Sequence, residues 1–227
     1  MSFKEFIREL NKDRVEGELI KTVFISLLSS LVLLGIIYYL SLKYIDNFIP
    51  KYGFYLVFAL LSFAFITPAI RQIRAYGQFA CMSGMMVGMT IGMISGFLPG
   101  FYIGATNGMF VGSVFGMFIG ITFGVWNGKC CGIMGIMEGV MAGFMGGLMG
   151  AMSSVMMIND NLIAAGVIVF LISSFILFGL NYMIYKEYKE SKRIYTEGQF
   201  FTIITSLVFT AITTWLMVFG PRSPLFA

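Results

Sequence analysis

Glycine recurs at every fourth position from Gly84 to Gly132. Each glycine inside a water-exposed helix costs roughly 1 kcal/mol relative to alanine, so such a run would destabilise a soluble helical protein. In a lipid bilayer the backbone must satisfy its hydrogen bonds within the segment, and small residues let neighbouring helices approach closely. The glycine repeat therefore predicts tightly packed helices inside a membrane.

The composition supports this prediction and excludes several classes of function. Hydrophobic residues make up 58% of the 227 residues, and charged residues only 11%; a soluble globular domain does not have this composition. The chain contains no histidine, which excludes histidine-ligated haem, histidine-based zinc or iron sites and Ser-His or Cys-His nucleophile pairs from this chain alone. The expectation is a membrane protein that is not an enzyme.

Seven apolar stretches are long enough to cross a bilayer. They lie at about residues 22–42, 53–70, 79–98, 102–127, 131–158, 162–185 and 200–219. Turn-forming residues separate them, including Pro99-Gly100 and the stretch from Asn127 to Lys129. The predicted fold is all-α and polytopic, with about seven transmembrane helices and a glycine-zipper core.

This prediction divides the chain into four parts. Residues 1–21 are predicted to form an amphipathic helix at the membrane surface, and residues 22–74 the first two transmembrane helices. A Gly/Met-rich three-helix module follows over residues 75–158, and residues 159–227 hold the last two helices.

Positive charge predicts the orientation. With the N-terminus in the cytoplasm, twelve of the 15 lysines and arginines fall on the inner side and three on the outer side. This asymmetry fits the positive-inside rule. We expect a multi-pass protein of the plasma membrane, with its C-terminus outside. The net charge of +4 comes from loops and indicates no nucleic-acid partner.

The repeat of four residues also predicts how the helices meet. A step of four advances slightly more than one helical turn, which favours right-handed winding of neighbouring helices. GxxxG contacts are typical of such crossings. These contacts either join the helices of the three-helix module to one another, or join the chain to further copies or to subunits of a larger membrane complex.

Methionine is concentrated in the same module. Of 18 methionines, 15 lie between Met82 and Met157, and those of residues 131–158, except Met157, share about one third of the helix circumference. Two such faces opposite one another would form a sulfur-lined column with sites about every 5.4 Å. Neutral, polarisable thioethers suit Cu(I) and bind hard cations poorly. The predicted relay ligands are Met82, Met86, Met89, Met93, Met137, Met141, Met145 and Met149.

The three cysteines extend this pattern. Cys81, Cys130 and Cys131 map to the inner ends of the predicted spans, where the cytosol keeps thiols reduced and able to bind a soft ion as thiolates. We therefore predict that they accept the ion released from methionine. The alternative is that methionine serves only as adaptable apolar packing.

Glu138 is an ionisable residue on the predicted methionine face. An ionisable group at membrane depth is a candidate for function. Glu138 is therefore a candidate coupling or gate residue, as a hard ligand at the inner gate or a proton-coupling carboxylate. The other possibility is an interfacial anchor paired with Lys129.

The segments Met82–Met93 and Met137–Met152 resemble the Met- and Gly-rich membrane segments of some bacterial membrane proteins that also carry a cupredoxin-like domain. The resemblance covers about residues 77–157 and implies a role with copper. The paired thioethers are also similar to those of trimeric copper importers, which use methionine rings above a GxxxG contact. This sequence differs in having neither a cupredoxin-like domain nor a histidine.

Three functions follow as hypotheses. The first is handling or transport of a soft monovalent ion, Cu(I) above all, through methionine-lined helix faces. The second is a non-catalytic accessory or scaffold subunit of a larger membrane complex, packed through its glycine ladder. The third is a cation- or proton-coupled transporter that uses Glu138.

Overall fold

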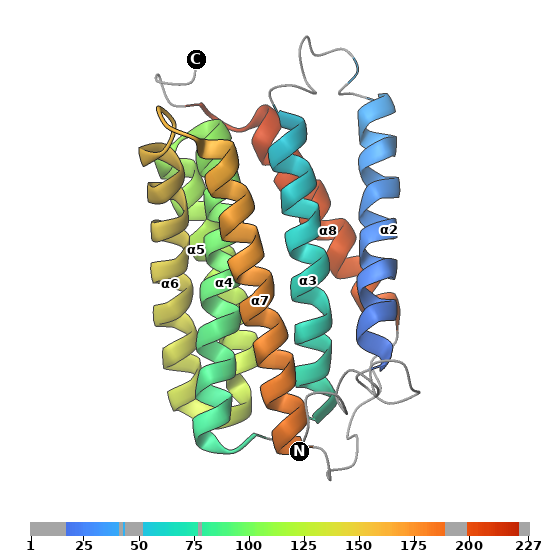
Figure 1. The fold of residues 1–227 in the computed structure, drawn as a ribbon, viewed down its shortest axis with the longest axis vertical. Coiled ribbons are helices and arrows are strands. Elements are labelled where there is room, and N and C mark those ends of the chain that lie inside the picture. The colour runs from blue at the N-terminus through green and yellow to red at the C-terminus, as the bar shows by residue number, and fades with distance from the viewer. Residues whose placement is uncertain (1–16, 41–42, 44–51, 77–78, 189–198, 223–227) are drawn as a thin grey trace.

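The protein is a bundle of helices. The computed structural model describes residues 17–40, 43, 52–76, 79–188 and 199–222, and the regular elements of this part are all helical (Figure 1). They are α2 (Gly17–Leu40), α3 (Phe54–Tyr76), α4 (Cys81–Asn107), α5 (Met109–Gly128), the 3-10 turn η3 (Lys129–Cys131), α6 (Gly132–Met156), α7 (Leu162–Tyr188) and α8 (Gln199–Phe219). Successive α-helices run in alternating directions (Figure 1). The predicted all-α fold is confirmed.

The number of membrane-spanning stretches differs slightly from the prediction. Six helical stretches in the described part are long and apolar enough to cross a membrane, where the sequence predicts seven. The difference lies in Met109–Met156, which counts as one stretch of 48 residues but which η3 divides into α5 and α6. The predicted surface helix over residues 1–21 lies mostly outside the described residues, and residues 17–21 belong to α2.

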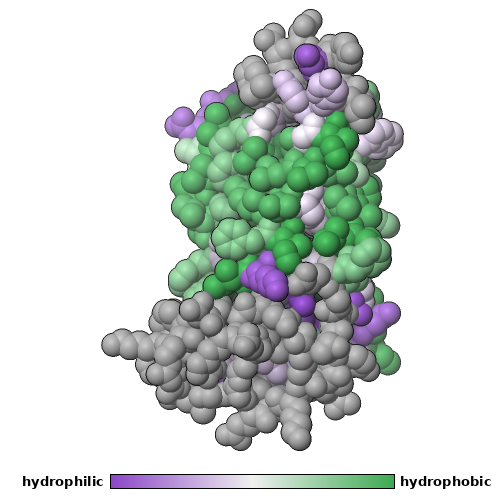
Figure 2. Space-filling view, turned by 90° about the vertical axis from the view of Figure 1, so that its right-hand side faces the viewer, coloured by the Kyte–Doolittle hydropathy of each residue, from purple (hydrophilic) through white to green (hydrophobic). Residues whose placement is uncertain are grey.

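The outer surface of the bundle is suited to lipid. Seen from the side of α2, an apolar belt crosses the visible face of the molecule, with hydrophilic residues above and below it (Figure 2). On α2, which lies on this side of the molecule, the apolar residues Phe24, Leu28 and Val32 are exposed. Because soluble proteins rarely expose apolar patches of this extent, the belt is consistent with a multi-pass protein embedded in a bilayer.

One predicted turn is wrong. The sequence predicts that Pro99-Gly100 separates two spans, yet α4 continues through Pro99 to Asn107. Proline is tolerated inside transmembrane helices because side chains and neighbouring helices satisfy the freed backbone groups. The chain instead reverses at Gly108, whose φ of 108° and ψ of 168° belong to a region of backbone conformation that is essentially restricted to glycine. Gly108 alone connects α4 to α5.

We therefore predict that Gly108→Ala destabilises the fold. A side chain in this backbone region costs about 1–3 kcal/mol, and the thermal midpoint of the detergent-solubilised protein should fall accordingly. Gly35→Ala is the matched comparison, because Gly35 lies inside α2 and a Cβ there would have no neighbouring atom within 4 Å. It should lose no stability, since alanine favours the helix over glycine by about 1 kcal/mol. Equal losses, or none at Gly108, would contradict the turn geometry.

Helices α4, α5 and α6 form a tightly packed group in which glycines meet backbone to backbone. A Cβ at Gly92 would lie 2.9 Å from the carbonyl oxygen of Gly139, and a Cβ at Gly96 would lie 3.0 Å from that of Gly143. A step of four residues in α4 corresponds to a step of four residues in the same direction in α6. The two helices therefore run parallel in a fixed register. Glycine contacts therefore fall within this chain, which is one of the two arrangements that the sequence left open.

Helix α5 packs antiparallel against α6 through the same glycines. A Cβ at Gly120 would lie 2.9 Å from the Cα of Gly143, and a Cβ at Gly124 would lie 2.9 Å from the Cα of Gly139. Here the residue number of the partner in α6 falls as the residue number of the glycine in α5 rises. Each step of four in α5 thus meets a step of four in α6, and the spacing of the repeat follows from this register.

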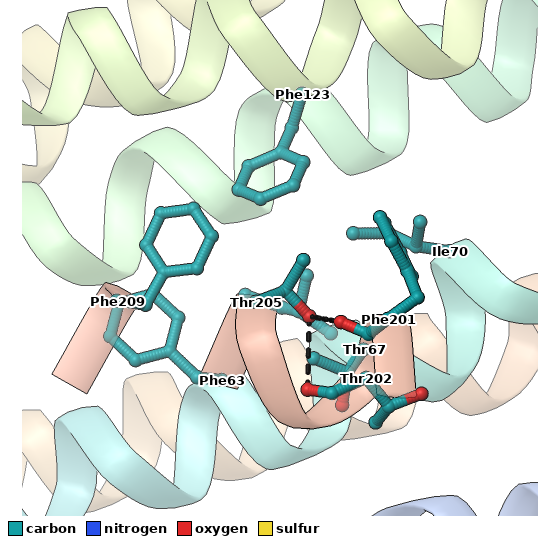
Figure 3. A pocket seen from close by; sticks show the side chains of 9 residues that line it. Phe63, Thr67, Ile70, Phe123, Phe201, Thr202, Thr205 and Phe209 are labelled. Carbon is teal, nitrogen blue, oxygen red and sulfur yellow. Dashed lines mark hydrogen bonds between the residues drawn. The ribbon is translucent and has the colours of Figure 1, made fainter. Parts of the chain in front are cut away.

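The remaining helices pack around α3, which contacts α2, α4, α7 and α8. Aromatic rings join them to the three-helix group: the centroids of Phe63 and Phe209 are 5.1 Å apart, and those of Phe123 and Phe209 are 4.9 Å apart. These rings border a cavity between α3, α5 and α8 of about 10 Å³ (Figure 3). Such a volume holds at most one water molecule, so this junction is packed nearly solid.

Candidate functional site

The methionines of the three-helix group lie on its outside. Thirteen of the 15 are exposed: Met82, Met86, Met89, Met93, Met109, Met134, Met137, Met141, Met145, Met149, Met152, Met156 and Met157. Among the eight predicted relay ligands the exposed fraction runs from 38% at Met93 to 77% at Met82. We call the exposed methionines of α4 and α6 the methionine face.

The predicted seam, in which the methionines of two helices face each other inside the bundle, is therefore not formed within one chain. The reason is the closeness of the backbones: a Cβ at Gly146 would meet the backbone of Met93, and one at Gly150 the backbone of Phe97. At this separation only glycine fits between the helices. The larger thioether side chains must project away from the contact, onto the outer surface.

The two stripes nevertheless belong to neighbouring parallel helices. The backbone of Met93 touches α6, so the methionine-bearing surfaces of α4 and α6 flank a shared line of contact. Along each helix the thioethers recur every three or four residues, which is about one turn or 5.4 Å. The methionine face thus presents closely spaced sulfur ligands along the bundle.

Other lipid-facing helices of this chain are built differently. The large hydrophobic side chains exposed on α7 are Ile163, Ile168, Leu171, Ile172, Phe175, Ile176 and Phe178. Those exposed on α2 are likewise leucine, isoleucine, valine and aromatic residues. Exposure to lipid therefore does not require methionine in this protein. The concentration of methionine in α4, α5 and α6 needs a separate explanation.

Cys81 lies far in the sequence from the adjacent residues Cys130 and Cys131, yet the three cysteines come together at one end of the methionine face. A Cβ at Gly84 would meet the Sγ of Cys131 and would lie 3.2 Å from the Sγ of Cys130. The Cys131 thiol donates to the carbonyl of Cys81 at 3.3 Å, and its side chain interacts with those of both Cys81 and Cys130. All three are free thiols. We call them the thiol cluster.

The thiols contact one another in pairs and do not form a ready-made three-ligand site. Within the described ranges, no group of three or more His, Cys, Asp or Glu side chains is arranged to hold a metal ion. The Cys130 thiol donates to the carbonyl of Asn127 at 3.0 Å, which draws it toward the end of α5. A soft ion bound here would use two thiols, or would draw the third sulfur toward it.

Glu138 lies on α6 and is half-buried. It comes one residue after Met137, on the outer side of the three-helix group. Lys129 is exposed at η3, and no ion pair joins the two residues in the described structure. The structure thus places the carboxylate beside the methionine face without the anchoring contact that one hypothesis required.

Sequence reasoning missed two features of this site. The glycines from Gly135 to Gly147 form a second step of four, out of phase with the first, and supply α6 with its contacts to both neighbours. The convergence of the thiols on Gly84 was also missed, although Gly84 is the first member of the glycine repeat. Both follow from the register of α4 against α6, which the spacing within one helix does not reveal.

Comparisons of the chain with protein-family models, curated proteins and solved structures found no match.

Proposed function

We propose that this protein handles or transports a soft monovalent metal ion, Cu(I) above all, along the methionine face. The observation that carries the proposal is the segregation of residues in the three-helix group, with glycine between the helices and methionine outside them. Methionine is useful as packing where it fills irregular gaps in a core. Exposed methionines fill no such gap, so packing alone explains them less well than ligand chemistry does.

The thiol cluster supports the same proposal from a second kind of ligand. Thioether and thiolate are the soft ligands that select Cu(I), and this chain collects both in one module. An ion that exchanges among weak, neutral thioether sites about one helical turn apart can move without falling into a deep trap. The thiol cluster then terminates the path with stronger ligands. No covalent step is involved.

The path needs a second surface, because the methionine face lies on the outside of the bundle. Lipid offers no ligands to an ion, so another protein surface would have to cover the thioethers. We propose that a further copy of the chain or a subunit of a larger membrane complex supplies it. The glycines of α4, α5 and α6 contact one another, so this partner would contact the methionines and not the repeated glycines.

We place the protein in the plasma membrane with the thiol cluster on the cytoplasmic side. In this orientation the ends of the helices that carry Arg71, Arg74, Lys129 and Lys186 lie inside, as the positive-inside rule requires. A reducing cytosol would keep the thiols free to bind metal.

A second candidate function is a non-catalytic accessory subunit of a membrane complex. The observation in its favour is again the exposure of the methionine face, since methionine is common at adaptable protein-binding surfaces. In this case the face would bind a partner helix and no metal.

Replacing the eight predicted relay methionines by leucine tests the proposal. In a background with all three cysteines changed to serine, only thioethers remain as soft ligands. We expect the purified protein with its methionines to retain Ag(I), measured by elemental analysis after washing, and the leucine variant to lose at least about nine tenths of it. The fold should persist, because a volume-conserving exchange at exposed positions costs little.

Met183→Leu with Met217→Leu is the matched control, because both methionines lie outside the three-helix group. It should leave the Ag(I) content unchanged. Equal metal content in all variants would contradict the proposal. A stoichiometric partner that is lost from the leucine variant, in protein that never binds Ag(I), would favour the accessory subunit.

A further inference from the structure

A second cavity lies between α2, α3 and α7, away from the methionine face. Its volume is about 230 Å³, and its lining comes from Leu19, Ile20 and Val23 of α2, Phe65 and Pro68 of α3, and Ser174, Leu177, Phe178 and Asn181 of α7. For comparison, an apolar cavity of about 150 Å³ is large enough to bind benzene. The cavity therefore has room for a ligand, whereas the cavity in Figure 3 is too small for one.

Asn181 gives this cavity a specific polar group. Its side chain is only 9% exposed, and its Oδ1 atom is buried with no hydrogen-bond partner. The main-chain carbonyl of the same residue accepts a hydrogen bond from Gln72 Nε2 at 3.3 Å, which ties this turn of α7 to α3. Buried polar groups in proteins are nearly always paired, so an acceptor that lines a cavity and has no partner indicates a missing donor.

The rest of the lining restricts what that donor can be. Apart from Asn181 and Ser174, the cavity is lined by apolar side chains, and none of its lining residues is charged. A charged group buried there would find no counter-charge among the lining residues, which is unfavourable. The ligand must therefore combine a neutral hydrogen-bond donor with an apolar chain.

We propose that this cavity binds a neutral membrane lipid that carries a free hydroxyl group, either a long-chain alcohol or a diacylglycerol. The hydroxyl donates to Asn181 Oδ1, and part of the hydrocarbon chain fills the space between α2, α3 and α7. Asn181 lies seven residues before the end of α7 at Tyr188, which is about 10 Å along the helix. A small hydroxyl head reaches this depth more easily than a phosphate does, because a phosphate carries its charge with it.

Photolabelling tests the proposal in the whole protein, reconstituted in phosphatidylcholine nanodiscs. The probe is a long-chain alcohol with a diazirine in its chain. We expect the probe to label peptides of α2, α3 or α7 that line the cavity. An unlabelled alcohol of the same length should compete about tenfold better than its methyl ether, which lacks the donor; this ratio corresponds to about 1.4 kcal/mol. The same competition is measured with a diacylglycerol and with a triacylglycerol, which lacks the free hydroxyl. It shows whether the hydroxyl that binds comes from a diacylglycerol or from a long-chain alcohol.

Two variants make the test specific. Ser174→Phe fills the cavity and should remove the labelling, whereas Ile172→Phe adds the same ring on the exposed side of α7, where Ile172 is 55% exposed, and should leave it unchanged. Asn181→Leu should keep the labelling but abolish the preference for alcohol over ether. Equal competition by alcohol and ether in the unmodified protein, or labelling that survives Ser174→Phe, would overturn the proposal. None of these outcomes depends on metal binding at the methionine face.

Discussion

Gly124→Leu is expected to prevent the three-helix group from assembling. A Cβ at Gly124 would meet the carbonyl oxygen of Gly139 and would lie 2.8 Å from its carbonyl carbon, so even the first atom of a side chain collides with backbone. Overpacking typically costs about 1–3 kcal/mol even where side chains can shift. Here the whole of α6 would have to move, so we expect the alanine variant to lose at least that much and the leucine variant to yield no folded protein.

The measurement is thermal unfolding of the detergent-solubilised protein, with recovery of monodisperse protein as a second readout. Gly35→Ala in α2 and Gly179→Ala in α7 are the controls, because a Cβ at either position has no neighbour within 4 Å. Both should leave stability unchanged or raise it by up to about 1 kcal/mol, since alanine favours the helix. If Gly124→Ala behaved as these controls do, the close packing of α5 on α6 would be contradicted.

Cys131→Ser is expected to weaken Cu(I) binding more than any other single exchange. Cys131 interacts with both other thiols. Its replacement therefore removes both of these thiol–thiol contacts at once. Serine is nearly the same size but is a hard and poor ligand for Cu(I). Changes to the surroundings of metal ligands alone cost about 10–100-fold in affinity, and loss of a ligand should cost at least about tenfold.

Competition with a colorimetric Cu(I) chelator measures this affinity. Cys130→Ser serves as the comparison within the cluster, because the Cys130 thiol already donates to a backbone carbonyl and should contribute less. An affinity that is unchanged in Cys131→Ser, and also in the variant with all three cysteines replaced, would show that the thiol cluster holds no ion.

The fold is predictable from the sequence because hydropathy and turn residues act locally. A bilayer requires stretches of about 20 apolar residues, and these are visible in the sequence without knowledge of the partners. The error at Pro99 has a physical cause: proline breaks helices in water, but inside a membrane protein its helix can continue. Gly108, which makes the real turn, is one glycine of a regular repeat and does not differ from its neighbours in the sequence.

The orientation of the methionine stripes is not predictable in the same way. Glycine and methionine are both apolar, so hydropathy does not say which of them faces the neighbouring helix. The sequence shows that the two residue types occupy different sides of α6, and the predicted seam places the sulfur atoms inward. The close contacts of Gly146 and Gly150 with α4 reverse that direction, because the smallest residue occupies the tightest contact.

X-ray absorption spectroscopy of the copper-loaded protein tests the role of the methionine face most directly. The measurement is made at the copper edge, on Cu(I) added to the purified protein in which the three cysteines are replaced by serine. We predict a first coordination shell made only of sulfur, which disappears when the eight relay methionines are changed to leucine. A shell of oxygen or nitrogen ligands, or no bound copper at all, would contradict soft-ion handling by this face.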